Sequence, residues 1–127
     1  MASFDDHLAA HERLFAHYEE LTGRLSDEQM ATPTLCPGWS VRDVIGHVIG
    51  AEAWLTGWTP SDQEPPPFER MAEFSARIEG VDRATFASIV AEATAARLEH
   101  LRSLGPDALD RPSFTPAGIH TYGRFLQ

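Results

Sequence analysis

The chain has 127 residues, of which 43% are hydrophobic and 23% charged, which suits one globular domain with a sizeable core. A formal net charge of −9, without clustered arginines, argues against a nucleic-acid or anionic-membrane partner. A single cysteine excludes an internal disulfide, and no run of about 18 apolar residues could span a membrane. The acidic N-terminus lacks the basic start of a signal peptide, so we expect a cytoplasmic protein.

The first expected helix covers residues 4–25, because apolar residues recur there at spacings of three, four and seven. Ser3, followed three residues later by Asp6, is typical of a helix start. A connector rich in proline and glycine follows at residues 26–39. In this connector, the polar run after Ser26 is expected to form a single helical turn.

The strongest local signal lies at the start of a central helix, expected over residues 40–58. Ser40 can cap this helix and Asp43 can bond back to its backbone, while Trp39 and Val44 occupy the two positions of a hydrophobic staple. A cap of this kind fixes where the helix begins, and therefore which side chains share a face. One expected row consists of Val44, His47, Ala51, Trp54 and Trp58, and the adjacent row of Val41, Ile45, Val48 and Leu55.

A proline-rich segment at residues 59–67 stops the central helix, and a shorter helix is expected over residues 68–79. A third long helix is expected over residues 83–104, ended by a Gly-Pro pair. The sequence shows no strand-like alternation, so we expect a loop before another helix that opens near Tyr122. The core positions expected in the third long helix are Phe86, Ile89, Val90, Ala93, Ala96, Leu101 and Leu104.

Three long amphipathic helices predict an all-α fold, an antiparallel up-down helical bundle. Such helices need a fourth partner to cover their apolar stripes, and the sequence ends at Gln127, soon after the last helix opens. We therefore expect one domain over residues 1–127 whose fourth helix is truncated. A short last helix, or a second copy that forms a homodimer through the uncovered helical face, would also cover the stripes.

His47 is the first candidate for chemistry, because its row places an imidazole on the inward side of the central helix. A histidine on an apolar face is more often a core residue bonded to a carbonyl or a buried acid than a ligand. Neutral imidazole is nevertheless the commonest protein ligand for zinc, although a catalytic metal needs about three protein ligands. His7 and His11 lie four residues apart and could share a metal, but the sequence contains no self-contained metal motif.

Three other features invite a functional interpretation and have a simpler structural one. Glu52 is expected to pair with an arginine, either Arg42 or Arg97. Cys36 precedes a helix N-terminus that could lower its pKa, although a small buried residue in a turn is the simpler expectation. The tryptophans expected to lie in the core rather than bind a ligand are Trp39, Trp54 and Trp58. A weaker option is a hydrophobic ligand held between Trp54, Trp58 and Phe74.

The segment TLCPGWSVRDVIGHV, residues 34–48, resembles the N-terminal metal-binding domain of mycothiol-dependent maleylpyruvate isomerases, in the DinB-like four-helix-bundle superfamily. In that family a Cys-x-Gly-Trp turn opens the second bundle helix, and a histidine two turns further on is a metal ligand. This histidine matches His47. The later stretch SFTPAGIHTYGRFL, residues 113–126, is similar to the lead-in of the family's fourth helix.

The resemblance implies that His47 is a ligand of a divalent metal, zinc being the first choice, and it reverses the preference for a core histidine. It also implies that the other ligands, an acid followed four residues later by a histidine, belong to the fourth helix. The sequence ends at Gln127, before that place, so no residue is assigned to them. We expect this chain alone to bind metal weakly or not at all through this site, and to be inactive. Catalytic and cofactor-binding residues stay unassigned.

The resemblance further implies an isomerase or transferase that acts on a small molecule with a low-molecular-weight thiol such as mycothiol. In such enzymes the metal polarises a substrate oxygen or lowers the pKa of the thiol. The alternative is a non-enzymatic helical module that oligomerises, a degenerate DinB-like relative without a working metal site.

Overall fold

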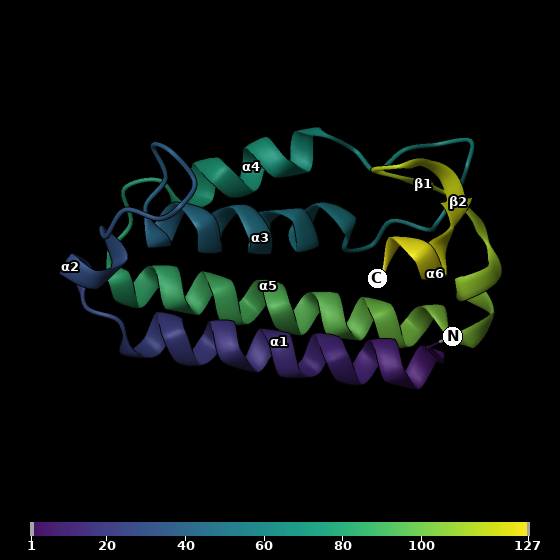
Figure 1. Ribbon diagram of the computed structural model, residues 1–127, viewed down its shortest axis with the longest axis horizontal. Helices are drawn as coiled ribbons and strands as arrows, with labels where there is room; N and C mark the ends of the chain where they lie inside the picture. Colours follow the sequence, from purple (N-terminus) through teal and green to yellow (C-terminus); the bar gives the residue numbers. More distant parts are fainter. Residues whose placement is uncertain (1, 127) are drawn as a thin grey trace.

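The computed structural model describes residues 2–126 and is mostly helical, which confirms the predicted all-α bundle. Figure 1 shows the long helices in layers, with α5 between α1 and α3, and α4 on the far side of α3. The elements, in chain order, are α1 (Phe4–Arg24), α2 (Asp27–Met30), α3 (Val41–Leu55), α4 (Glu69–Ile78), α5 (Arg83–Leu104), a short 3-10 helix η1 (Pro106–Asp110), β1 (Pro112–Thr115), β2 (Gly118–Thr121) and α6 (Tyr122–Phe125). Within residues 2–126, no helix combines the length and the apolar character that crossing a membrane requires.

The helix starts lie where the sequence predicts them. Ser3, Ser26 and Ser40 each accept a hydrogen bond from the backbone three residues later, and the side chain at that later position bonds back to the serine N–H. Asp82 caps α5 in the same way, by accepting a hydrogen bond of 2.7 Å from the N–H of Thr85. These caps satisfy N–H groups that have no partner inside their own helices, which is why they position the helices so well.

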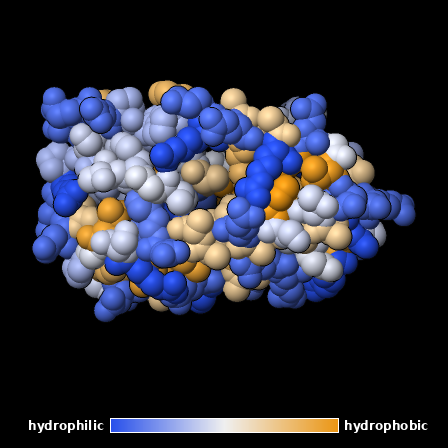
Figure 2. Space-filling view, turned by 180° about the vertical axis from the view of Figure 1, so that it is seen from behind, coloured by the Kyte–Doolittle hydropathy of each residue, from blue (hydrophilic) through white to orange (hydrophobic). Residues whose placement is uncertain are grey.

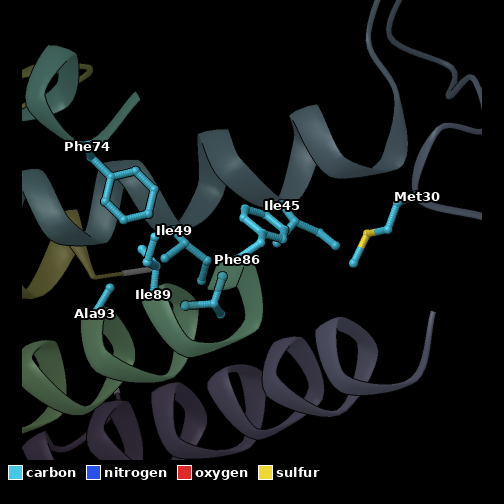
Figure 3. Packing of buried hydrophobic residues seen from close by; sticks show 8 residues of the cluster. Met30, Ile45, Ile49, Phe74, Phe86, Ile89 and Ala93 are labelled. Atoms are coloured by element: carbon cyan, nitrogen blue, oxygen red, sulfur yellow. The ribbon is translucent and has the colours of Figure 1, made fainter. Parts of the chain in front are cut away.

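Two apolar clusters fill the space between the helices. The first, which we call the α2-end cluster, consists of Met30, Ile45, Ile49, Phe74, Phe86, Ile89, Val90 and Ala93. Figure 3 shows Phe74 reaching down from α4 toward Ile49, with Ile89 and Ala93 below on α5. The second, the α6-end cluster, consists of Leu55, Trp58, Leu101, Ala108 and Tyr122. The two clusters divide the bundle lengthwise, and α3 and α5 contribute to both.

The segment before α6 is not the loop that the sequence predicted. It contains η1 and an antiparallel hairpin in which Pro112 pairs with Thr121 and Thr115 with Gly118. Two prolines made the segment read as a loop, yet Pro112 stands at the first position of its strand, where no ladder N–H is required. Gly118, with φ at +104°, begins the second strand, and each strand is too short to show alternation.

Most of the predicted core face of α5 is confirmed, since Phe86, Ile89, Val90, Ala93 and Leu101 are buried. Ala96 is exposed, whereas Thr94 and Arg97 are buried, neither of which was expected inside. The prediction assigned positions by apolar character alone. Apolar character alone does not reveal a polar residue that is buried because its hydrogen-bond partners lie far away in the sequence.

Candidate functional site

His47 lies on the exposed side of α3, so the predicted inward orientation of its side chain is wrong. The residues of α3 that are buried are Ile45, Gly46, Ile49, Gly50 and Leu55. His47 is not among these buried residues. Its imidazole packs against the indole of Trp39, with ring centroids 4.9 Å apart and ring planes at 66°. Trp39 itself is 39% exposed, which corrects its predicted place in the core.

Two glycines explain why the apolar pattern placed the wrong face of α3 inside. A Cβ atom on Gly46 would lie 2.8 Å from Cδ1 of Ile78, and one on Gly50 would lie 3.1 Å from Cδ1 of Phe74. The missing side chains therefore let α4 pack directly on the α3 backbone. Glycine carries no hydrophobic signal, but the spacing Gly-x3-Gly within a helix marks such a close approach and could have indicated the buried edge.

The turn before α3 holds Trp39 beside His47. The N–H of Thr34 donates to the carbonyl of Trp39 at 3.0 Å, and the N–H of Trp39 donates to the carbonyl of Cys36 at 3.0 Å. Gly38 has φ at +80°, a conformation that favours glycine. Cys36 is in the predicted turn, but it is exposed rather than buried.

A groove of about 830 Å³ runs between α3 and α4, and His47 is part of its lining. At one end, Arg42 ties the two helices together, because its guanidinium donates to the carbonyls of Ile78 and Val81 at 2.7 and 3.0 Å. The same group lies 4.3 Å above the centre of the Phe86 ring. The guanidinium of Arg42 therefore links α3 to the end of α4 and does not pair with Glu52.

Glu52 instead pairs with Arg97, the second of the two predicted partners. Arg97 is fully buried, and its Nε donates to Oε2 of Glu52 at 2.8 Å. Its two terminal nitrogens donate to Nδ1 of His100 at 2.9 Å and to the hydroxyl of Tyr122 at 3.1 Å. One guanidinium therefore joins α3, α5 and α6. The sequence predicted the ion pair with Glu52 but not the contacts with His100 and Tyr122.

Burial at this end of the bundle shifts two titrating groups. It lowers the pKa of His100, and the positive charge of Arg97 lowers it further. Burial also raises the pKa of the Tyr122 hydroxyl, which the neighbouring Arg97 partly counteracts. Both shifts favour neutral His100 and Tyr122 side chains beside the buried Arg97.

The remaining histidines do not gather into a metal centre. The side chain of His11 donates from Nδ1 to the carbonyl of His7 at 2.7 Å, and Nε2 of His120 lies 3.1 Å from the carbonyl of Ala117. No group of three or more His, Cys, Asp or Glu side chains within residues 2–126 is placed to hold a metal ion. His47 as a metal ligand therefore stays a prediction.

The other tryptophans lie as follows. Trp58 is buried, and its indole N–H donates to the carbonyl of Glu64 at 3.0 Å. Trp54 is half-buried and stacks on Phe68 with centroids 5.4 Å apart. Because Trp58 and Phe74 belong to different clusters, the structure gives no support to a ligand held between them.

Two known proteins resemble part of this chain in sequence, and one solved structure resembles it in fold. Over 61 residues, it is 34% identical to two uncharacterized proteins of Mycobacterium tuberculosis, from two strains; this match covers 48% of the chain and 34% of each relative. A solved histidine-to-alanine mutant of the mycothiol-dependent maleylpyruvate isomerase superposes with a TM-score of 0.66 at 19% identity. That superposition covers 99% of this chain but 57% of the solved one, so the relatives are considerably longer than the shared part.

The sequence model of one family spans almost the whole chain. The mycothiol maleylpyruvate isomerase N-terminal domain matches residues 9–125, a range that includes the turn at Cys36, His47 and the hairpin. The match extends well beyond the two motifs that first suggested the resemblance. The chain therefore belongs to the mycothiol maleylpyruvate isomerase N-terminal domain family.

Proposed function

We propose that this chain is the metal-binding helical domain of a thiol-dependent isomerase or transferase, with His47 as one ligand of a divalent metal such as zinc. The observation that carries the proposal is the position of the imidazole. It is exposed at a groove, and within residues 2–126 no hydrogen bond engages its ring nitrogens. A neutral imidazole without a hydrogen-bond partner has a ring nitrogen available to bind a metal.

The residues of the described chain fit such a metal only in part. A catalytic metal takes about three protein ligands, and His47 supplies one. When bound, the metal would act as a Lewis acid toward a substrate oxygen or lower the pKa of a thiol. We derive no reaction step from an incomplete ligand set. What this chain contributes is the ligand itself and the groove beside it.

Family membership supports the proposal of a thiol and of a small-molecule substrate. Mycothiol is the thiol that the family name carries, and a small-molecule substrate is proposed with it. The net charge of −9 supports a function without nucleic acid. These proposals concern the whole enzyme, of whose relatives this chain matches between 34% and 57% of the length.

Elemental analysis tests the metal ligand. Metal content is measured in the protein as its gene encodes it, in its His47→Ala variant, and in His17→Ala as the control at another exposed histidine. We expect about one equivalent in the encoded protein. The metal should be lost in His47→Ala and kept in His17→Ala. Unchanged metal in a folded His47→Ala protein would contradict the assignment.

A second candidate is the oligomerising helical module. It is favoured by Leu14, which is 44% exposed on α1 beside an open hollow of about 370 Å³ lined also by Leu55, Phe125 and Leu126. A second copy could cover this surface. Light scattering should then give a dimer that Leu14→Asp converts to a monomer, whereas a folded monomer for the unmodified chain would dismiss this candidate.

A further inference from the structure

A second hollow, of about 700 Å³, lies at the end of the bundle where α1 begins. Its lining comes from the start of α1, from η1, from the hairpin and from α6, which Figure 1 shows together at the right-hand end of the molecule. Within residues 2–126, its lining and that of the groove at His47 do not overlap. The volume lies in the range of about 300–1,000 Å³ that is typical of ligand pockets.

His7 is the most deeply buried polar side chain in the lining of this hollow. It is 8% exposed, and within residues 2–126 no hydrogen bond engages its ring nitrogens. Buried polar groups nearly always have a partner, because an unpaired one loses its hydrogen bonds to water. Over the same residues, the side-chain atom that is both sealed from solvent and unpaired is Nε1 of Trp54, so the ring nitrogens of His7 stay accessible. A ligand in the hollow can therefore bond to them.

Arg124 supplies the positive charge of the hollow. Its side chain is exposed, and among residues 2–126 no carboxylate forms an ion pair with it. The backbone N–H of Arg124 donates to Oγ1 of Thr121 at 3.4 Å, a contact that fixes the start of α6. A guanidinium offers a planar fork of donors that matches the two oxygens of a carboxylate, and a neutral imidazole adds one N–H. Arg124 and His7 together therefore suit a carboxylate group.

The rest of the lining limits the charge of the ligand and offers it an apolar surface. Asp110 is exposed at the same hollow, and its negative charge disfavours a second negative charge on the ligand, as in a phosphate dianion. His120 contributes less, because its Nε2 already lies 3.1 Å from the carbonyl of Ala117. Leu109 and Ile119 also belong to the lining, and Ile119 is 51% exposed. A monoanion with an apolar body fits this combination.

We propose that this hollow binds a small monocarboxylate, with the carboxylate group bonded to Arg124 and His7 and the apolar body of the ligand against Leu109 and Ile119. The site requires neither a metal nor a thiol, and it shares no residue with the groove at His47 within the described part of the chain. Loss of the metal role of His47 would therefore leave this inference unaffected, and failure of this inference would leave that role unaffected.

The test measures the binding of benzoate to the protein as its gene encodes it, by calorimetry and by backbone NMR shifts. We expect saturable binding, with shifts concentrated on residues 2–8, 106–112 and 119–124. Benzamide has nearly the same shape without the charge, and it should bind about tenfold more weakly because it forms no charge-assisted hydrogen bond. Inorganic phosphate should also bind more weakly than benzoate. Phosphate binding as tight as that of benzoate would overturn the choice of a monocarboxylate.

Matched variants assign the binding to the two side chains. Arg124→Gln should weaken benzoate binding about tenfold, whereas Arg13→Gln, at an exposed arginine of α1 outside the lining, should leave it unchanged. His7→Phe keeps an aromatic ring without the N–H and should weaken binding about threefold, compared with His17→Phe at an exposed position of α1. Thermal unfolding checks that each variant is folded, and if His7→Phe is not, the two arginine variants decide. Absence of saturable benzoate binding, or equal binding by folded Arg124→Gln and Arg13→Gln, would overturn the inference.

Discussion

The two ends of the bundle are stabilised in different ways. The α2-end cluster is built from apolar side chains of α2, α3, α4 and α5 (Figure 3). Two glycines of α3 let α4 approach closely. The α6-end cluster surrounds a fully buried arginine whose partners come from three elements. Close packing of apolar side chains positions the helices at the α2 end. Hydrogen bonds to the buried arginine position them at the α6 end. The functional candidates His47 and Trp39 lie toward the α2 end, which depends on apolar packing.

Removing the buried cation should have the largest effect. Arg97→Met leaves Glu52, His100 and Tyr122 without their common donor, and loss of one partner of a buried ion pair costs about 3–5 kcal/mol. The matched control is Arg102→Met, whose exposed pair with Glu12 is worth less than about 1 kcal/mol. Urea unfolding measures both.

A double variant sharpens this comparison. Arg97→Met combined with Glu52→Leu removes the uncompensated carboxylate and should recover part of the lost stability, because apolar pairs often replace buried ion pairs at little cost. If Arg97→Met alone unfolds no more easily than Arg102→Met, the α6 end does not depend on its hydrogen bonds in the way proposed.

The packing of the α2 end predicts an intermediate effect. Gly46→Leu forces a side chain into the position where even a Cβ atom would approach Ile78 to 2.8 Å, and overpacking costs about 1–3 kcal/mol. Gly23→Ala is the control in α1, where nothing lies within 4 Å of the new Cβ; it should stabilise the protein by about 0.5–1 kcal/mol through helix propensity. Thermal unfolding distinguishes the two, and a stabilising Gly46→Leu would refute the close approach.

The smallest expected effect is a pH dependence confined to the α6 end. Since the pKa of His100 is lowered from 6.5 on folding, the unfolded chain binds more protons between the lowered value and 6.5. Stability should therefore fall as the pH decreases through this window and level off below it. In His100→Gln, whose amide oxygen can still accept from Arg97, this component should vanish. Urea midpoints from pH 7.5 to 5 measure it, and identical slopes would exclude His100 as its source.

The sequence predicted where the helices begin better than it predicted which face of each helix is buried. The caps at Ser3, Ser40 and Asp82 are local, so the sequence identifies the helix starts reliably. Which face of a helix is buried depends on side chains from distant parts of the chain that pack against it or bond to it. Gly46 and Gly50 give no apolar signal, and Arg97 is inside only because residues 45 positions before and 25 after it supply acceptors.

The role of His47 as a metal ligand stays a prediction, and the surroundings of its side chain were not predicted. His47 and the turn at Cys36 came from the resemblance, and the family match agrees with it. The groove could not be predicted, because it arises where α4 meets α3 across a linker whose path the prolines alone do not define. Figure 2, seen from behind the view of Figure 1, shows apolar residues at the surface in separate patches among hydrophilic ones, another feature that depends on the assembled fold.

The contact between α1 and α5 has a consequence for how the chain folds. Thr94 donates to Glu19 across 75 positions, and Arg102 to Glu12 across 90. Pairings so distant in sequence close a large loop, and domains rich in them fold more slowly than those built from local contacts. During synthesis, the apolar stripe of α1 must therefore wait for α5 to emerge, and in that interval it is the surface most available to a chaperone.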